Sequence, residues 1–262
     1  MNILIIGAGK LGLPLAKHLH AKGHSVTTLS RSPKDVPQGM THICADVHTL
    51  THEHLQGCFD WVYVILTPKE RSLLGYQRAY VDSIAPLVAA LGNHPVTRLI
   101  YVSSTQVYGQ NAGEDINDDT PPHPSTAYGK ILRAAELLWQ AHFQDKLTIV
   151  RPSGLMADDR TFLANLAINL TQSDEQHWLN LIHRDDVINI LAALPSLDTL
   201  LDSYILSAHS IIRHTLLNAI RHQHNLPTID ISNNLPTTGK KLHATRLQRI
   251  LDTNHITLTP IY

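Results

Sequence analysis

The chain has 262 residues, of which 43% are hydrophobic, and its formal net charge is −1 at pH 7. This composition supports a large buried core rather than disorder. The balanced charge argues against nucleic acid or an anionic membrane as a partner, so a small-molecule substrate is expected. No run reaches about 18 uncharged apolar residues and no cleavable signal is visible, which predicts a cytoplasmic protein without membrane association.

Short runs rich in β-branched residues alternate with helical patterns along the chain. Strands are expected at 2–7, 25–29, 41–45, 61–66, 98–104 and 147–152, and helices at about 11–22, 69–91 and 125–144. This alternation is typical of βαβ units, and the apolar strands indicate that helices cover both faces of the sheet. The sequence therefore predicts an α/β protein with a doubly wound parallel sheet, a Rossmann fold.

The carboxyl-terminal part is expected to add a small substrate lobe. We predict a nucleotide-binding core at 1–160, continued by about 178–194, and a lobe formed by 161–177 and 195–262. Such a lobe would lie over the carboxyl ends of the strands, where open sheets bind ligands. The basic residues in 238–251, "TGKKLHATRLQRIL", are interpreted as the solvated face of a terminal helix rather than as a substrate site.

A glycine turn follows the first expected strand. Gly7, Gly9 and Gly12 form a GxGxxG pattern between this strand and the first helix. The first glycine permits a tight turn, the second lets a pyrophosphate approach the backbone, and the third allows close packing of helix on strand. Phosphate groups also bind well at a helix amino terminus. We predict a dinucleotide site here that includes Lys10 and Leu11.

The residues after the second strand indicate which dinucleotide is bound. An acidic residue would hold an unmodified ribose, but this position is Ser30, followed by Arg31 and Ser32. Hydroxyl donors and a guanidinium suit a 2′-phosphate, so NADP is favoured and NAD is the alternative. The other interpretation is an exposed loop that contains an arginine by chance.

Cysteine and histidine do not indicate a metal site. Cys44 and Cys58 are interpreted as free, buried thiols, because their spacing matches neither a disulfide framework nor a zinc site. The 18 histidines are scattered without a ligand set at metal spacing. We therefore expect no metal ion.

Residues 7–33 resemble the amino-terminal stretch of the β-hydroxyacid dehydrogenases, which bind NADP through a similar glycine turn and arginine. The second half of those enzymes is a long helical domain with a glycine-rich substrate loop and a catalytic lysine. Here Gly239 is the only glycine after Gly154, so the second half fits poorly. A β-hydroxyacid dehydrogenase-like enzyme remains an alternative.

The middle of the chain resembles the extended short-chain dehydrogenase/reductases, in particular the divergent, atypical branch of the NAD-dependent epimerases and dehydratases. The resemblance rests on "RLIYVSSTQVYG" (98–109), "TAYGKILRAAE" (126–136), "VRPSGL" (150–155) and "NLIHRDDVINIL" (180–191). It extends from Asn2 to about Val187. It implies an NAD(P)-binding oxidoreductase or epimerase/dehydratase-like protein that acts on a hydroxyl or carbonyl carbon of a small, sugar-related substrate.

The same resemblance implies roles for individual residues. Ser104 would hydrogen-bond the substrate oxygen, and Tyr128 would transfer a proton as hydride moves to or from nicotinamide. Asp46 would contact the adenine amino group or merely accept a turn hydrogen bond, and Thr67 belongs to the expected coenzyme site. In this family two helices often form a homodimer through a four-helix bundle, and 69–91 and 125–144 are the candidates.

One residue departs from the family pattern. The lysine that usually follows the tyrosine by four residues is replaced by Leu132. Lys130 and Arg133 lie roughly 200° and 140° around the helix from Tyr128, so neither is a simple substitute. Three interpretations remain: activation of Tyr128 by nicotinamide or by another basic residue, loss of turnover in a redox-responsive regulator, or a helix that begins late enough for Lys130 to reach the coenzyme.

Overall fold

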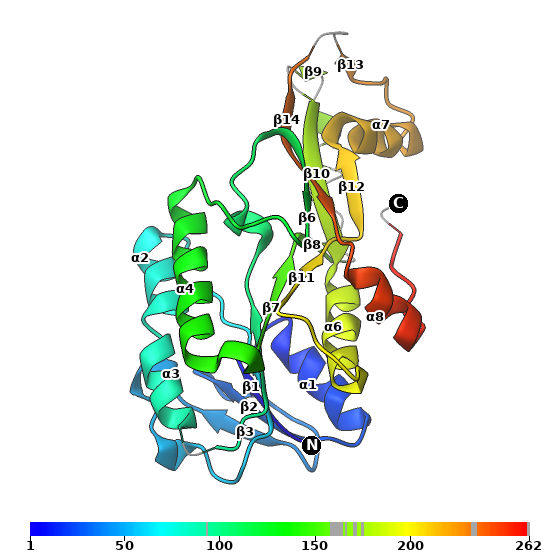
Figure 1. The fold of residues 1–262 in the computed structure, drawn as a ribbon. Helices are drawn as coiled ribbons and strands as arrows, with labels where there is room; N and C mark the ends of the chain where they lie inside the picture. Colours follow the sequence, from blue (N-terminus) through cyan, green and yellow to red (C-terminus); the bar gives the residue numbers. More distant parts are fainter. Residues whose placement is uncertain are drawn as a thin grey trace.

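The main sheet contains seven parallel strands in the order β11-β7-β5-β4-β1-β2-β3 (Figure 1). The computed structural model describes residues 1–92, 94–157, 165, 167–169, 172–173, 176–231 and 235–260. The strands are β1 (Asn2–Ile6), β2 (Ser25–Ser30), β3 (Thr41–Cys44), β4 (Trp61–Val64), β5 (Arg98–Val102), β7 (Leu147–Pro152) and β11 (Ser203–Leu206). Six of them match the strands expected from the sequence.

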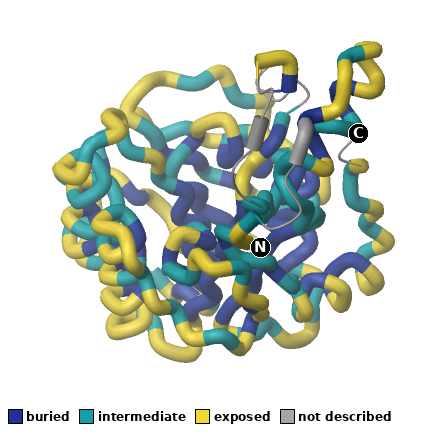
Figure 2. The backbone as a smooth tube through the Cα atoms, turned by 90° about the horizontal axis from the view of Figure 1, so that it is seen from above, coloured by how far each residue is buried: buried dark blue, intermediate teal, exposed yellow. Residues whose placement is uncertain are grey.

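Helices cover both faces of this sheet, as the apolar strands require. The helices α1 (Gly12–Ala21), α6 (Arg184–Ala193) and α8 (Leu247–Asn254) pack on one face, and α3 (Ile84–Leu91) and α4 (Ala127–Phe143) pack on the other. Figure 1 shows the two groups on opposite sides of the strands, and Figure 2 shows buried segments of the chain in the interior with exposed segments around them. The doubly wound Rossmann fold is therefore confirmed.

The expectation of a single helix at 69–91 is wrong. The segment forms α2 (Leu73–Tyr76), a π-helical turn η3 (Gln77–Val81) and α3. The Ser83 hydroxyl donates to the carbonyl of Ala79 at 2.7 Å, a local contact that competes with the regular helical ladder. Pro86 has no amide hydrogen and lies in the first turn of α3, where prolines are tolerated. Apolar periodicity alone did not reveal this interruption.

A second sheet stands above the carboxyl ends of the main strands (Figure 1). Its strand order is β12-β10-β14-β6, and β8 pairs with β10. The strands are β6 (Ala112–Asn117), β8 (Gly154–Met156), β10 (Gln176–His183), β12 (His209–Ile212) and β14 (Thr237–His243), with α7 (Arg213–Gln223) beside them. The backbones of β9 (Gln172–Ser173) and β13 (Asp230–Ile231) form a separate pair. None of the helices in the described part has both the length and the apolar character of a membrane span.

The expected core and lobe ranges interleave. β6 and β8 come from the range 1–160 but join the second sheet, whereas β11 comes from 195–262 and completes the main sheet. All four residues of β11 are buried, which suits a strand covered on both faces. Residues 161–164, 166, 170, 171, 174, 175, 232–234, 261 and 262 of the lobe range lie outside the described residues. The division into core and lobe stays a prediction.

Three smaller expectations need correction. The stretch 238–251 is not one terminal helix, because Lys240 and Lys241 lie in β14 and only its end belongs to α8. Cys44 and Cys58 are exposed rather than buried. Cys44 ends the edge strand β3 and Cys58 lies in the loop before β4, so neither has a second layer covering it.

Candidate active site

The glycine turn joins β1 to α1 at the carboxyl edge of the main sheet. Gly7 has a φ of +108°, and a Cβ atom there would collide with the carbonyl of Ile65. A Cβ atom on Gly12 would collide with the carbonyl of Gly7, but one on Gly9 would meet no atom within 4 Å. Gly7 and Gly12 are therefore required by packing, whereas Gly9 faces open space, as a pyrophosphate would need.

The other residues of the turn suit the same ligand. Lys10 is exposed and Leu11 is buried where α1 begins. The first amide groups of a helix have no partners within the helix and attract phosphate. The residues present thus fit a dinucleotide on an observation independent of the motif, namely the open side of Gly9.

The loop after β2 carries the residues that are expected to bind a 2′-phosphate. Arg31 is exposed, and within the described part of the chain its guanidinium has no hydrogen-bond or ion-pair partner. The Ser30 hydroxyl donates to the carbonyl of Ser32 at 2.9 Å. Ser30 therefore uses its donor inside the turn, which departs from the expectation of a donor aimed at phosphate. Contact of residues 30–32 with a coenzyme stays a prediction.

Asp46 and Thr67 lie in the loops that follow β3 and β4, respectively. Asp46 Oδ1 accepts from the His48 amide at 3.0 Å and from His48 Nδ1 at 2.8 Å, so it caps a short 3₁₀ turn, η1 (Val47–Thr49). The His48 amide hydrogen bond is the main reason that the pKa of Asp46 is lowered. This is the turn role considered above. Thr67 is exposed in the loop after β4.

Ser104 begins a 3₁₀ turn, η4 (Thr105–Val107), directly beyond β5. Its Oγ accepts from the Gln106 amide at 3.2 Å, which leaves its own hydrogen available to another acceptor. A Cβ atom on Gly129 would collide with the Gln106 carbonyl, so the first turn of α4 packs directly on η4. The structure thus brings the elements that carry Ser104 and Tyr128 together.

Tyr128 lies in the first turn of α4 and is partly buried. Its hydroxyl donates to the carbonyl of Arg71 at 3.4 Å, and its ring packs edge-on against Tyr76 with centroids 4.6 Å apart. The Thr126 side chain caps α4 by accepting from the Gly129 amide at 3.0 Å. Lys130 is exposed and already belongs to this first turn, so the interpretation in which the helix begins later is wrong.

Leu132 occupies the position of the usual lysine and makes apolar contacts there. It is 2% exposed and packs in a cluster with Val107, Tyr108, Ile116, Ile205 and Leu242. These residues come from different elements, including two strands of the second sheet, β6 and β14, so the position is filled by tertiary packing. Tyr128 therefore receives no charge from this position.

One helical turn beyond Leu132 lies an ion pair that the sequence reasoning missed. Glu136 is 0% exposed and accepts from Arg151 Nε at 2.8 Å, from Arg151 Nη2 at 3.0 Å and from Arg133 Nη1 at 2.9 Å. Arg151 also donates to the Tyr108 hydroxyl at 3.0 Å. The three-residue spacing of Arg133 and Glu136 was the available signal for their own contact, whereas the contact with Arg151 joins α4 to β7 and has no local signal. Arg151 is thus neutralised within the core.

Three serines extend the polar character of the carboxyl edge. The strands β5, β7 and β11 are neighbours in the sheet, and a serine directly follows each of them: Ser103 after β5, Ser153 after β7 and Ser207 after β11. Their hydroxyl oxygens are buried and have no hydrogen-bond partner among the described residues. This edge therefore carries unsatisfied polar groups as well as Ser104 and Tyr128.

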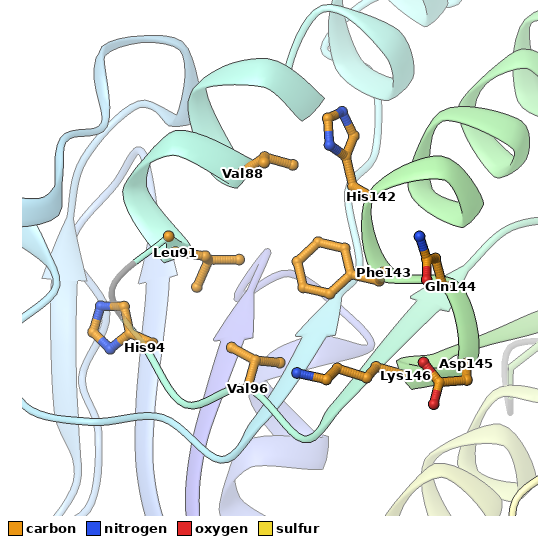
Figure 3. Close-up of a pocket in the computed structure, with 10 residues that line it drawn as sticks. Val88, Leu91, His94, Val96, His142, Phe143, Gln144, Asp145 and Lys146 are labelled. Carbon is orange, nitrogen blue, oxygen red and sulfur yellow. The ribbon is translucent and has the colours of Figure 1, made fainter.

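A cavity of about 360 Å³ lies away from these residues. Figure 3 shows that its wall is formed by the end of α3, the end of α4 and the segments that lead into β5 and β7. These are the amino ends of the strands, opposite the edge where open sheets bind ligands. Its lining is mixed, with apolar side chains such as Leu91 and Phe143 beside polar ones such as His142 and Lys146 (Figure 3). We do not assign it to the active site.

Comparison with known proteins agrees with this geometry. Residues 7–196 match a family model described as NAD(P)H-binding. Protein YeeZ of Escherichia coli K12 is 30% identical over 202 residues, which are 74% of this chain and 72% of YeeZ.

Solved structures show the same fold. A Methylobacillus flagellatus protein classed as an NAD-dependent epimerase/dehydratase has a TM-score of 0.77 at 30% identity, covering 95% of this chain and 90% of that one. MoeE5 in complex with UDP-glucuronic acid and NAD has a TM-score of 0.77 at 17% identity, covering 99% and 94%. The β-hydroxyacid dehydrogenase alternative gains no support, because the described second half is rich in strands. The chain belongs to the NAD(P)H-binding family, and its fold is that of the NAD-dependent epimerases and dehydratases of short-chain dehydrogenase/reductase type.

Proposed function

We propose that this chain is a cytoplasmic NADP-dependent oxidoreductase or epimerase/dehydratase-like enzyme that acts on a hydroxyl or carbonyl carbon of a small, sugar-related substrate. The observation that carries the proposal is that three features share the carboxyl edge of the main sheet: the open side of Gly9, the hydroxyl of Ser104 and the hydroxyl of Tyr128. The guanidinium of Arg31, which is exposed and makes no hydrogen bond within the described residues, supports NADP over NAD.

The chemistry assigns a separate task to each hydroxyl. When bound, the nicotinamide supplies or accepts the hydride. Ser104 donates its free hydrogen to the substrate oxygen and so orients the reacting carbon. In the reducing direction the Tyr128 hydroxyl gives its proton to the same oxygen as the carbonyl becomes an alcohol. In the oxidising direction both transfers reverse.

We assign to Arg71 the positive charge that Leu132 does not provide. The Arg71 carbonyl is the hydrogen-bond acceptor of Tyr128, and its guanidinium is exposed and has no partner in the described part of the chain. Arginine keeps its charge at all relevant pH values, so it would stabilise a phenolate without exchanging the proton itself.

Two measurements test the proposal. NADPH and NADH are titrated by fluorescence, and carbonyl compounds are surveyed for NADPH oxidation by the wild type and by Tyr128→Phe. We expect NADPH to bind more tightly and Tyr128→Phe to lose turnover while it keeps coenzyme affinity. Absence of binding by either coenzyme would overturn the proposal.

A second function is favoured by one observation, the burial of Leu132 in an apolar cluster. A protein that binds the coenzyme without turnover would act as a redox-responsive regulator. Coenzyme binding that is indifferent to Tyr128→Phe, with no NADPH oxidation, would identify this function.

We also propose a homodimer through α2 and α4. Leu73 and Leu74 on α2, and Leu137 and Leu138 on α4, are exposed apolar residues on the two helices expected to pair. Light scattering would give a monomer mass in solution if this assignment is wrong.

A further inference from the structure

The loop at residues 30–32 turns three successive carbonyls toward the edge strand β3. The Ser30 carbonyl accepts from the Ala45 amide at 3.1 Å, and the Arg31 carbonyl accepts from the Cys44 thiol at 3.4 Å. The Ser32 carbonyl lies 3.1 Å from His42 Nε2. Each carbonyl of the loop therefore has a partner in or next to β3.

His42 is held at both ring nitrogens. A carbonyl oxygen only accepts hydrogen bonds, so Nε2 carries a hydrogen and donates it to Ser32. Nδ1 lies 2.8 Å from the hydroxyl of Thr28, a fully buried residue of β2. The imidazole thus connects the interior of the sheet to the end of the loop.

This arrangement matters for an anion. A phosphate is bound by cations and N–H groups, whereas the negative end of a carbonyl dipole repels it. Among the three donors, the Ala45 amide belongs to the backbone and a thiol is a weak donor, so His42 is the strong side-chain donor. We propose that His42 is a positioning residue that sets the preference for a 2′-phosphorylated coenzyme by holding the Ser32 carbonyl away from the phosphate. This inference rests on the proposed NADP function.

Loss of the His42 side chain is expected to have a moderate effect on NADPH affinity. The Ser30 hydroxyl also donates to the Ser32 carbonyl, so loss of His42 removes one of two side-chain restraints. The net contribution of one hydrogen bond corresponds to about a three- to tenfold change in an equilibrium constant. Asp46, whose carboxylate interacts electrostatically with Arg31, is the same in all variants and does not affect the comparison.

The test compares Kd values for NADPH and NADH in four proteins: wild type, His42→Ala, His42→Gln and His52→Ala. His52 is the matched control because it is an exposed histidine in the nearby turn η2 (His52–His54). We expect His42→Ala to weaken NADPH about three- to tenfold. We also expect NADH affinity to stay within about twofold of the wild-type value. His42→Gln should restore most of the preference, since its amide can donate to the same carbonyl, and His52→Ala should have no effect.

The contrary outcomes are distinct. An unchanged ratio of the two Kd values in His42→Ala, or equal weakening of both coenzymes, overturns the role of His42. Wild-type protein that binds NADPH and NADH equally also overturns it, because no preference exists to be set, yet leaves dinucleotide binding intact. Wild-type protein that binds neither coenzyme overturns the proposed function itself.

Discussion

A methyl group at Gly9 separates the coenzyme-binding role of the glycine turn from its structural role. An added Cβ atom there meets nothing within 4 Å, and Gly9 is not among the glycines with positive φ. We therefore expect Gly9→Ala to change the free energy of unfolding by no more than about 0.5 kcal/mol. The same change at Gly7 forces a left-handed residue, at about 1–3 kcal/mol. It also collides with the Ile65 carbonyl, at about 1–3 kcal/mol more.

Gly9→Ala should change coenzyme affinity strongly, although it changes stability little. If the pyrophosphate approaches the backbone at Gly9, a methyl group occupies its path, and overpacking of this kind costs about 1–3 kcal/mol. This corresponds to roughly a five- to 150-fold loss of affinity. Because both coenzymes share the pyrophosphate, NADPH and NADH should weaken together. Arg31→Ala, in contrast, should weaken only NADPH.

Urea unfolding of Gly9→Ala, Gly7→Ala and wild type gives the free energy of unfolding, and fluorescence titration of the same proteins gives the coenzyme affinity. Gly9→Ala that is stable and binds both coenzymes as tightly as wild type would refute the assignment of the open side of Gly9 to the coenzyme. Gly7→Ala with wild-type stability would contradict the packing argument at Ile65.

Three further predictions follow from single contacts. Glu136→Gln should lower the free energy of unfolding by about 3–5 kcal/mol, because Arg151 is left buried without its counter-charge; a change below about 1 kcal/mol in urea unfolding would contradict this. Asp46→Ala should cost about 1 kcal/mol at neutral pH through loss of the cap. Since the folded pKa of Asp46 is lowered, this stabilisation is present above the ordinary value of 3.8 and is lost as the pH falls through the folded value, so the variants should converge in acid unfolding curves. Arg71→Gln should reduce kcat for NADPH oxidation while Arg71→Lys retains most of it and Lys69→Gln serves as control; equal loss in Arg71→Lys and Arg71→Gln would rule out a role for charge.

Much of the main sheet could be predicted because the determining signals are local. The runs at 2–7, 25–29 and 147–152 are rich in β-branched residues, and the glycine spacing at 7, 9 and 12 encodes a turn whose steric needs are visible in the sequence. Ser104 and Tyr128 were expected near one another from the resemblance to the extended short-chain dehydrogenase/reductases. The packing of η4 on Gly129 agrees with that placement.

The remaining features depend on contacts between distant segments. β11 has only four residues, and no sequence period distinguishes it from a strand of the lobe. The lysine pair in β14 resembles a polar helix face until strand pairing with β6 is known. Burial of Leu132 requires Leu242 of that same strand, and the alignment of carbonyls at 30–32 requires β3. Tertiary context decides such cases over local preference.

The position of β11 has a consequence for synthesis of the chain on the ribosome. Until residue 206 has left the exit tunnel, β7 is an unpaired edge, and its "LTIVRP" sequence presents open amide and carbonyl groups. The nascent protein must therefore shield this strand while β8, β10 and α6 are being translated, and fragments that stop before residue 203 should be prone to aggregation.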